Sequence, residues 1–167
     1  MRQAVPGYGL YAITDTGLSG DLAVEVAVKQ AILGGARIIQ YREKHLRGAE
    51  LEATAARLAI LCRRHGVPLI INDDIGLAAR CGASGVHLGR DDSPVQAARE
   101  QLGDEAIIGV SCYDSLARAT GAVAAGADYV AFGRFYPSRS KPQAVPADPS
   151  LLTRARAELE VPVVAIG

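Results

Sequence analysis

Short runs of consecutive apolar residues alternate along the chain with longer segments in which apolar residues recur at helical spacing. The runs predict seven strands, at residues 10–15, 38–42, 69–71, 86–88, 107–110, 129–132 and 161–166. Helices are predicted at 21–33, 49–65, a short segment ending near 81, a segment opened by Ser93 as N-cap with Pro94 at the first helical position, 115–125 and 150–159. The strands are almost purely apolar, which is typical of parallel strands covered on both faces. Strict alternation of strand and helix predicts an α/β fold.

A Gly-Ala pair stands just before the second, fourth and sixth predicted strands, at Gly35-Ala36, Gly82-Ala83 and Gly126-Ala127. A repeat of two strands fits a (β/α)₈ TIM barrel, in which alternate strands fill alternate core layers. We therefore expect residues 1–167 to form a single TIM-barrel domain that lacks the last strand and the last two helices. Because an open barrel leaves strand edges unpaired, we also expect that the gene product is longer or that something else covers the gap.

Composition narrows the class of protein. The 18 basic and 18 acidic residues cancel and form no basic stripe, which argues against nucleic-acid binding. No apolar stretch approaches the length of a membrane span, and no signal peptide is apparent at the N-terminus. Cys62, Cys81 and Cys112 are odd in number and widely spaced, which favours reduced thiols in a cytoplasmic protein over disulfides or a zinc site.

Polar side chains gather just after the strands, at the ends that form the active-site face of a (β/α)₈ barrel. In chain order they are Gln40, Arg42, Lys44, Asn72, Asp73, Asp74, Arg90, Asp91, Asp92, Ser111, Ser138, Arg139, Ser140 and Lys141. Carboxylates and cations at one mouth suit a metal-bridged diphosphate, because Mg²⁺ takes one or two carboxylates together with phosphate oxygens. The residues alone predict a barrel enzyme that handles a phosphorylated small molecule.

Each of these signals also has an ordinary structural interpretation. Asp73 and Asp74 can cap the following helix, and Asp91 and Asp92 can be solvated residues near a helix start. His87 lies within an apolar strand, where a histidine is more often a hydrogen-bonded core residue than a catalyst. The stretch from 138 to 141 can be an ordinary loop.

At these positions the chain resembles the thiamine-phosphate synthase family. The matching stretches are residues 11–15 (YAITD), 40–44 (QYREK), 71–74 (INDD), 85–89 (GVHLG) with 91–92 (DD), 109–112 (GVSC), 137–142 (PSRSKP) and 162–167 (PVVAIG). They follow the family's order across essentially the whole chain. The resemblance implies a Mg²⁺-dependent transferase that joins 4-amino-2-methyl-5-(diphosphomethyl)pyrimidine to thiazole phosphate, giving thiamine phosphate and diphosphate.

The resemblance also implies roles for individual residues. Asp73 and Asp92 are expected to ligate Mg²⁺, and Arg42, Lys44, Ser111 and Lys141 are the expected catalytic residues. Substrate contacts are expected from Gln40, Tyr41, Arg42, Glu43, Lys44, Asn72, Ser111, Ser138, Arg139, Ser140, Lys141 and Gly167. The expected partners are the two small-molecule substrates. Whether the protein forms a homo-oligomer stays open.

The chain departs from the family pattern in three places. Tyr113 stands where many members have histidine, Arg134 stands where proline is common, and the family continues past Gly167 with residues that help to bind the thiazole phosphate. Two alternatives to the synthase stay open. One is a thiazole tautomerase-like homologue that transfers a proton, for which a histidine near Ser111 would be expected in place of Tyr113. The other is a non-catalytic protein that binds thiamine phosphate, which fits a chain that ends before the thiazole-phosphate site is complete.

Overall fold

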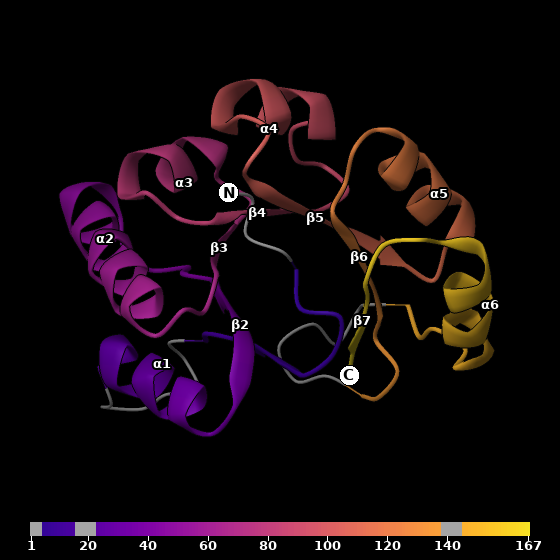
Figure 1. Cartoon of the computed structure of the whole chain (residues 1–167), viewed down its shortest axis with the longest axis horizontal. Coiled ribbons are helices and arrows are strands. Elements are labelled where there is room, and N and C mark those ends of the chain that lie inside the picture. The colour runs from indigo at the N-terminus through magenta and orange to yellow at the C-terminus, as the bar shows by residue number, and fades with distance from the viewer. Residues whose placement is uncertain (1–4, 16–22, 138–144) are drawn as a thin grey trace.

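The computed structural model describes residues 5–15, 23–137 and 145–167. Its strands form one sheet in which neighbours are parallel and follow chain order. They are β1 (Leu10–Ile13), β2 (Ala36–Tyr41), β3 (Leu69–Asn72), β4 (Gly85–Leu88), β5 (Ile107–Tyr113), β6 (Tyr129–Gly133) and β7 (Val163–Ile166). The sheet curves into an open barrel, which confirms the predicted α/β architecture (Figure 1).

Helices lie outside the strands and cover the outer face of the sheet (Figure 1). They are α1 (Val24–Leu33), α2 (Gly48–Arg64), α3 (Ile75–Cys81), α4 (Val95–Leu102), α5 (Leu116–Ala124) and α6 (Ser150–Glu158). None of the helices in the described segments is both long enough and apolar enough to cross a membrane. The predicted elements are thus present, with their ends shifted by a few residues.

The start of α4 differs from the prediction. Ser93 was expected as the N-cap, with Pro94 inside the helix. In the structure Pro94 is itself the N-cap, with ψ at 155°, and the helix begins at Val95. The extended ψ of Pro94 places it before the first helical turn, so Ser93 lies one position too early to cap that turn. The N-cap of α5 is Ser115, whose side chain accepts a hydrogen bond from Arg118 N.

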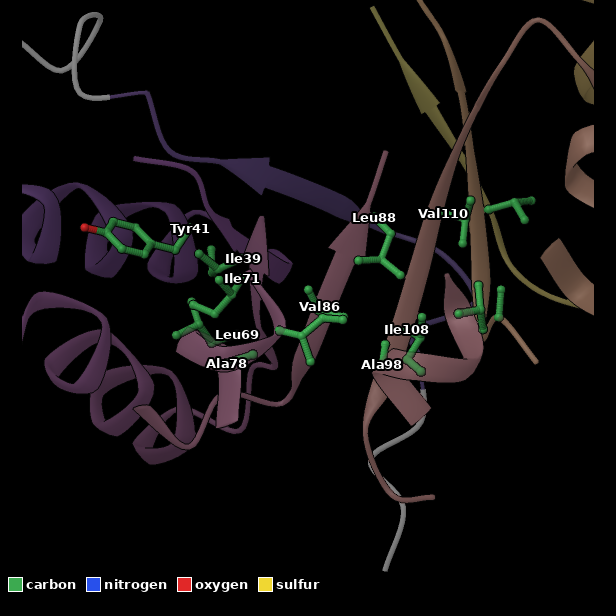
Figure 2. Close-up of a cluster of buried hydrophobic side chains, with 14 of the residues drawn as sticks. Ile39, Tyr41, Leu69, Ile71, Ala78, Val86, Leu88, Ala98, Ile108 and Val110 are labelled. Atoms are coloured by element: carbon green, nitrogen blue, oxygen red, sulfur yellow. The ribbon is translucent and has the colours of Figure 1, made fainter. Parts of the chain in front are cut away.

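Two hydrophobic clusters fill the molecule, because alternate residues of a strand face opposite sides of a sheet. The larger cluster lies between sheet and helices and includes Ile39, Ile71 and Ile108 (Figure 2). The smaller cluster lies inside the barrel and consists of Ile38, Ile70, Ile107 and Tyr129, with Val5 and two further side chains packed against it. Burial of each such aliphatic side chain contributes about 1.5–3 kcal/mol.

The barrel is held together at its amino end by a clamp around Arg99 of α4. Its guanidinium donates to the carbonyl of Ala106 at 2.7 Å and pairs with the carboxylate of Asp128 at 2.8 Å. The same carboxylate oxygen accepts from the N–H of Ile108 at 2.7 Å. One side chain thereby ties a helix to the starts of β5 and β6.

The strand pairing runs from β1 to β7 and joins no further strand within the described segments. The two terminal strands are also less buried than the central ones. Leu10 and Ile13 of β1 are 58% and 41% exposed, whereas Ile70 and Ile108 of the central strands are fully buried. The predicted seven-stranded, open arrangement is therefore the arrangement observed.

Candidate functional site

A cavity of about 270 Å³ opens at the carboxyl ends of the strands. It is lined by Tyr11, Ile13, Thr14, Asp15, Gln40, Arg42, Asn72, His87, Ser111, Tyr113, Ala131, Phe132, Gly133, Arg134, Val164, Ile166 and Gly167. Five of the predicted site residues are among these: Gln40, Arg42, Asn72, Ser111 and Gly167. The structure therefore brings together residues from strands that are far apart in the sequence, at the face where a barrel places its active site.

The alternation of side chains along β2 decides which residues of the QYREK stretch face this cavity. Gln40 lines the cavity and is only 3% exposed, and Arg42 lines it two positions later. Thr14 fixes Arg42 by accepting from its backbone N–H at 2.9 Å and donating to its carbonyl at 3.1 Å. A hydroxyl that follows β1 thus fixes the backbone of an arginine that lines the cavity.

Tyr41 lies on the other side of the strand, where it belongs to the outer hydrophobic cluster and is 2% exposed. Figure 2 shows its ring on the side of the sheet that carries Ile39 and Ile71. Burial, followed by the nearby charges of Glu43 and Glu25, raises the pKa of Tyr41 to about 12. The expected substrate contact of Tyr41 therefore does not match its position, because period-two alternation turns residue 41 away when 40 and 42 face inward.

Glu43 and Lys44 are not among the residues that line the cavity. The carboxylate of Glu43 accepts from the backbone N–H groups of His45 at 2.6 Å and Leu46 at 3.2 Å. Although desolvation acts to raise it, these backbone hydrogen bonds hold the pKa of Glu43 below its usual value. Glu43 thus shapes the turn after β2, and Lys44 is exposed beside it.

Asp73 and Asp92 follow the neighbouring strands β3 and β4. Asp73 N donates to the carbonyl of His87 at 2.9 Å, which continues the β3–β4 pairing one residue beyond the strand. Asp73 has φ of 66°, a left-handed backbone that aspartate tolerates better than most residues, and its carboxylate accepts from the amide of Asn72 at 2.6 Å. The carboxylate of Asp92 accepts a hydrogen bond from Gly89 N, which holds it against the end of β4. Both acids therefore stand at adjacent strand ends.

The pair is small for a metal site made of protein alone. In the described part of the chain, no three His, Cys, Asp or Glu side chains gather as a group that could hold a metal ion. Two carboxylates at adjacent strand ends do fit Mg²⁺, which is commonly held by one or two carboxylates, with substrate phosphates and water completing its octahedron. Asp74, in contrast, caps α3 by accepting from Leu77 N at 2.8 Å, as its ordinary interpretation predicted.

Arg118 of α5 secures the ends of β4 and β5. Its Nε donates to the carbonyl of Ser111 at 2.8 Å, and its Nη2 donates to the carbonyl of Gly89 at 2.9 Å. Tyr113 lines the cavity near Arg118, and the guanidinium of Arg90 lies 4.7 Å from the centroid of the Tyr113 ring. Neither Arg118 nor Tyr113 carried an expected role, and a cation that bridges two strand ends leaves no sequence motif.

Beneath the cavity lie side chains to which the sequence analysis assigned no substrate role. Tyr129 is fully buried and is hydrogen-bonded to both Tyr11 and His87, which line the cavity above it. The network continues from Tyr11 to Gln40 and from His87 to Ser111. Desolvation raises the pKa of Tyr11 to about 12, partly offset by its hydrogen bonds to Tyr129 and Gln40. The ordinary interpretation of His87 as a hydrogen-bonded core histidine is confirmed, although its ring also lines the cavity.

Ser138, Arg139, Ser140 and Lys141 lie outside the described residues. The three cysteines are free, buried thiols on the outer side of the sheet, as the prediction of reduced thiols requires. Burial raises the pKa of Cys62 and Cys112 to about 11, so they are poor nucleophiles and poor metal ligands.

Comparison with known proteins shows likeness in sequence and in structure. A family model described as thiamine monophosphate synthase matches residues 10–167. The chain is 52% identical over 162 residues to a thiamine-phosphate synthase of Methylococcus capsulatus, covering 97% of this chain and 72% of that protein. It is 53% identical over 159 residues to one of Marinobacter nauticus, covering 95% and 71%. A solved thiamine phosphate pyrophosphorylase from Pyrococcus furiosus has a TM-score of 0.83 at 32% identity, covering 96% of this chain and 75% of that chain.

Proposed function

The chain belongs to the thiamine monophosphate synthase family, and from this premise we propose that it joins an aminopyrimidine bearing a diphosphomethyl group to a thiazole phosphate, with Mg²⁺. The products are thiamine phosphate and diphosphate. The observation that carries the proposal is the make-up of the cavity. Residues with amide and hydroxyl side chains line the cavity together with an arginine, and two carboxylates stand at adjacent strand ends.

The floor suits a flat heteroaromatic ring with ring nitrogens and an amino group. The side chains of Gln40, Asn72 and Ser111 offer neutral donors and acceptors that can pair with such a ring without burying a charge. Aromatic rings of Tyr11 and Tyr113 add apolar surface for its faces. We assign the pyrimidine to this floor.

The wall and the rim suit a diphosphate. Arg42 presents a planar fork that matches phosphate oxygens, and Thr14 fixes the backbone that carries it. Asp73 and Asp92 would hold Mg²⁺, which when bound supplies positive charge that offsets the charge developing on the diphosphate. Lys44 from the rim and Lys141 from outside the described residues are proposed to add cations on the same group.

In the proposed reaction the carbon–oxygen bond to the diphosphate breaks first, and its electron pair leaves with the diphosphate. The thiazole nitrogen then donates its lone pair to the methylene carbon and forms the new C–N bond. The chain supplies no nucleophile, so its contribution is to orient the two substrates and to stabilise charge. Ser138, Arg139, Ser140 and Gly167 are proposed to contact the thiazole phosphate.

The test follows diphosphate release with both substrates and MgCl₂, using a coupled pyrophosphatase assay. Release that requires both substrates supports the synthase. Thiazole isomerisation without diphosphate release would identify a tautomerase, and saturable binding of thiamine phosphate without either reaction would identify a non-catalytic binder. Either of the last two results overturns the proposal.

Asp73→Asn and Asp92→Asn test the metal ligands, because asparagine tolerates the left-handed backbone at 73 and can still accept from Gly89 N at 92. Both variants should fold normally and lose Mg²⁺-dependent turnover by roughly 100-fold or more. Asp91→Asn removes an exposed carboxylate next to Asp92 and should keep wild-type turnover. Near-normal turnover in both Asp73→Asn and Asp92→Asn would refute their role.

A further inference from the structure

An unbroken line of hydrogen bonds crosses the floor of the cavity from one wall to the other. Gln40 Nε2 donates to Tyr11 Oη at 3.0 Å, and Tyr11 Oη lies 2.8 Å from Tyr129 Oη. Tyr129 Oη lies 2.9 Å from His87 Nδ1, and His87 Nε2 lies 2.8 Å from Ser111 Oγ. Five strands therefore contribute one residue each to a single network whose two ends, Gln40 and Ser111, face the proposed pyrimidine.

Two directions of hydrogen-bond donation fit these distances, because each tyrosine has one hydrogen to donate and its oxygen can accept more than one. In one of them Tyr11 accepts from Gln40 and gives its own hydrogen to Tyr129 Oη. The hydrogen of Tyr129 then goes to His87 Nδ1. His87 therefore carries its proton on Nε2 and donates to Ser111 Oγ, which leaves the hydrogen of Ser111 to point into the cavity.

Tyr129 is the most deeply buried member of the network. Its side chain is fully buried, and its ring stacks on His87 with centroids 5.6 Å apart and planes at 26°. The ring also passes over Gly109 of β5 so closely that a Cβ there would lie 1.9 Å from Cζ. Burial first, and then its contact with Tyr11, raises the pKa of Tyr129 well above the usual value, so the phenol keeps the hydrogen that the network needs.

We propose that the hydrogens run in this direction and that Tyr129 is a positioning residue that orients both ends of the cavity floor through Tyr11 and His87. In this arrangement Ser111 acts as a donor to the ligand and the amide oxygen of Gln40 acts as an acceptor. The ligand edge that fits has a ring-nitrogen acceptor facing Ser111 and an amino donor facing Gln40. This inference rests on the proposed function for its ligand, and the tautomer of His87 tests it without any ligand.

The first measurement is the protonation of His87 in the ligand-free protein, by two-bond ¹H–¹⁵N correlation after labelling of histidine. The chain has three histidines, and the other two, His45 and His65, are exposed, so the signal of His87 is readily assigned. The expected result is an unprotonated Nδ1 and a protonated Nε2. A proton on Nδ1 would reverse the hydrogen bonds that link Tyr11, Tyr129, His87 and Ser111, and would overturn the proposal.

The second measurement is kinetic. Tyr129→Phe keeps the ring over Gly109 and removes the hydroxyl, so kcat for diphosphate release should fall about 10- to 100-fold per folded molecule, with a smaller change in KM. The His87 nitrogen signals should shift in the same variant. Tyr8→Phe, which removes the hydroxyl of an 83% exposed tyrosine, is the matched control and should change neither quantity.

Tyr11→Phe tests the Gln40 end of the network separately from the Ser111 end. It also replaces Tyr129→Phe as the kinetic test if that variant does not fold. It removes the acceptor for Gln40 but leaves Tyr129 to donate to His87, so the His87 tautomer should persist while kcat still falls. If the wild-type protein releases diphosphate and the folded tyrosine variants have the same kcat, the positioning role is overturned and the proposed function stands. Absence of diphosphate release in the wild type would overturn the proposed function, and the tautomer would still decide the direction of the network.

Discussion

Replacing Gly109 with alanine tests whether the cavity floor depends on the place of the Tyr129 ring. An alanine Cβ would lie 1.9 Å from Cζ of Tyr129 and 2.3 Å from its Oη. Nonbonded carbons prefer a separation of about 3.5 Å, so the ring would have to retreat by roughly 1.5 Å. A shift of that size breaks the contacts of Tyr129 Oη with Tyr11 and His87, which are 2.8 and 2.9 Å long.

The expected cost combines two effects. Overpacking of a closed core costs about 1–3 kcal/mol, and each lost hydrogen bond costs about 1 kcal/mol, so the free energy of unfolding should fall by about 3–5 kcal/mol. For a domain of this size each kcal/mol lowers Tm by about 2–4 °C, which gives a decrease of roughly 10 °C. Diphosphate release should also fall, because both ends of the floor lose their orientation.

Thermal unfolding followed by circular dichroism measures the effect, with Gly121→Ala as the control. Gly121 lies in α5, where an added Cβ meets nothing within 4 Å, so alanine there should raise stability by about 0.5–1 kcal/mol. Adding Tyr129→Val to Gly109→Ala removes the clash, and the penalty of the alanine should then largely disappear. A Tm for Gly109→Ala within about 2 °C of wild type would refute the close packing and the argument built on it.

Three further predictions concern stability. Arg99→Ala should lower the free energy of unfolding by about 2–3 kcal/mol in urea titrations, because it removes the ion pair of the largely buried Asp128 carboxylate. The control Arg154→Ala, on the exposed face of α6, should change the free energy of unfolding by less than about 0.5 kcal/mol. Tyr41→Phe should leave stability unchanged or raise it by up to about 1 kcal/mol, because among the described residues the buried Tyr41 hydroxyl has no hydrogen-bond partner; a clear loss would contradict this. The unfolded chain gives up the Tyr11 proton near pH 10 whereas the folded chain keeps it to about pH 12, so stability should fall by about 2–3 kcal/mol over that interval, and Tyr11→Phe should reduce the slope.

The order of elements and the location of the site could be predicted from local pattern. Apolar runs separated by helical segments predicted parallel strands, and each Gly-Ala pair does precede a strand, with Gly35, Gly82 and Gly126 in left-handed conformations that release the chain from the preceding helix. Because all carboxyl ends of parallel strands meet at one face, the polar residues after them had to converge. Gln40, Asn72 and Ser111 accordingly line one cavity.

Strand alternation also predicts which residues of a family motif face the cavity, which the resemblance by itself does not. A motif marks residues 40–44 as one unit, whereas a strand turns consecutive side chains to opposite faces. Tyr41 therefore packs beneath the helices although its neighbours on both sides face the cavity.

What the tertiary structure alone decided is the chemistry of the cavity floor. Tyr11, His87 and Tyr129 lie 76 and 42 positions apart in the chain, as 87 − 11 and 129 − 87, and no local pattern relates them. They meet because the curvature of the barrel brings β1, β4 and β6 around a common axis, and because Gly109 leaves space for a ring where another residue would place a side chain. Local sequence sets which way each side chain points, but which side chains point at one another depends on how the whole sheet closes.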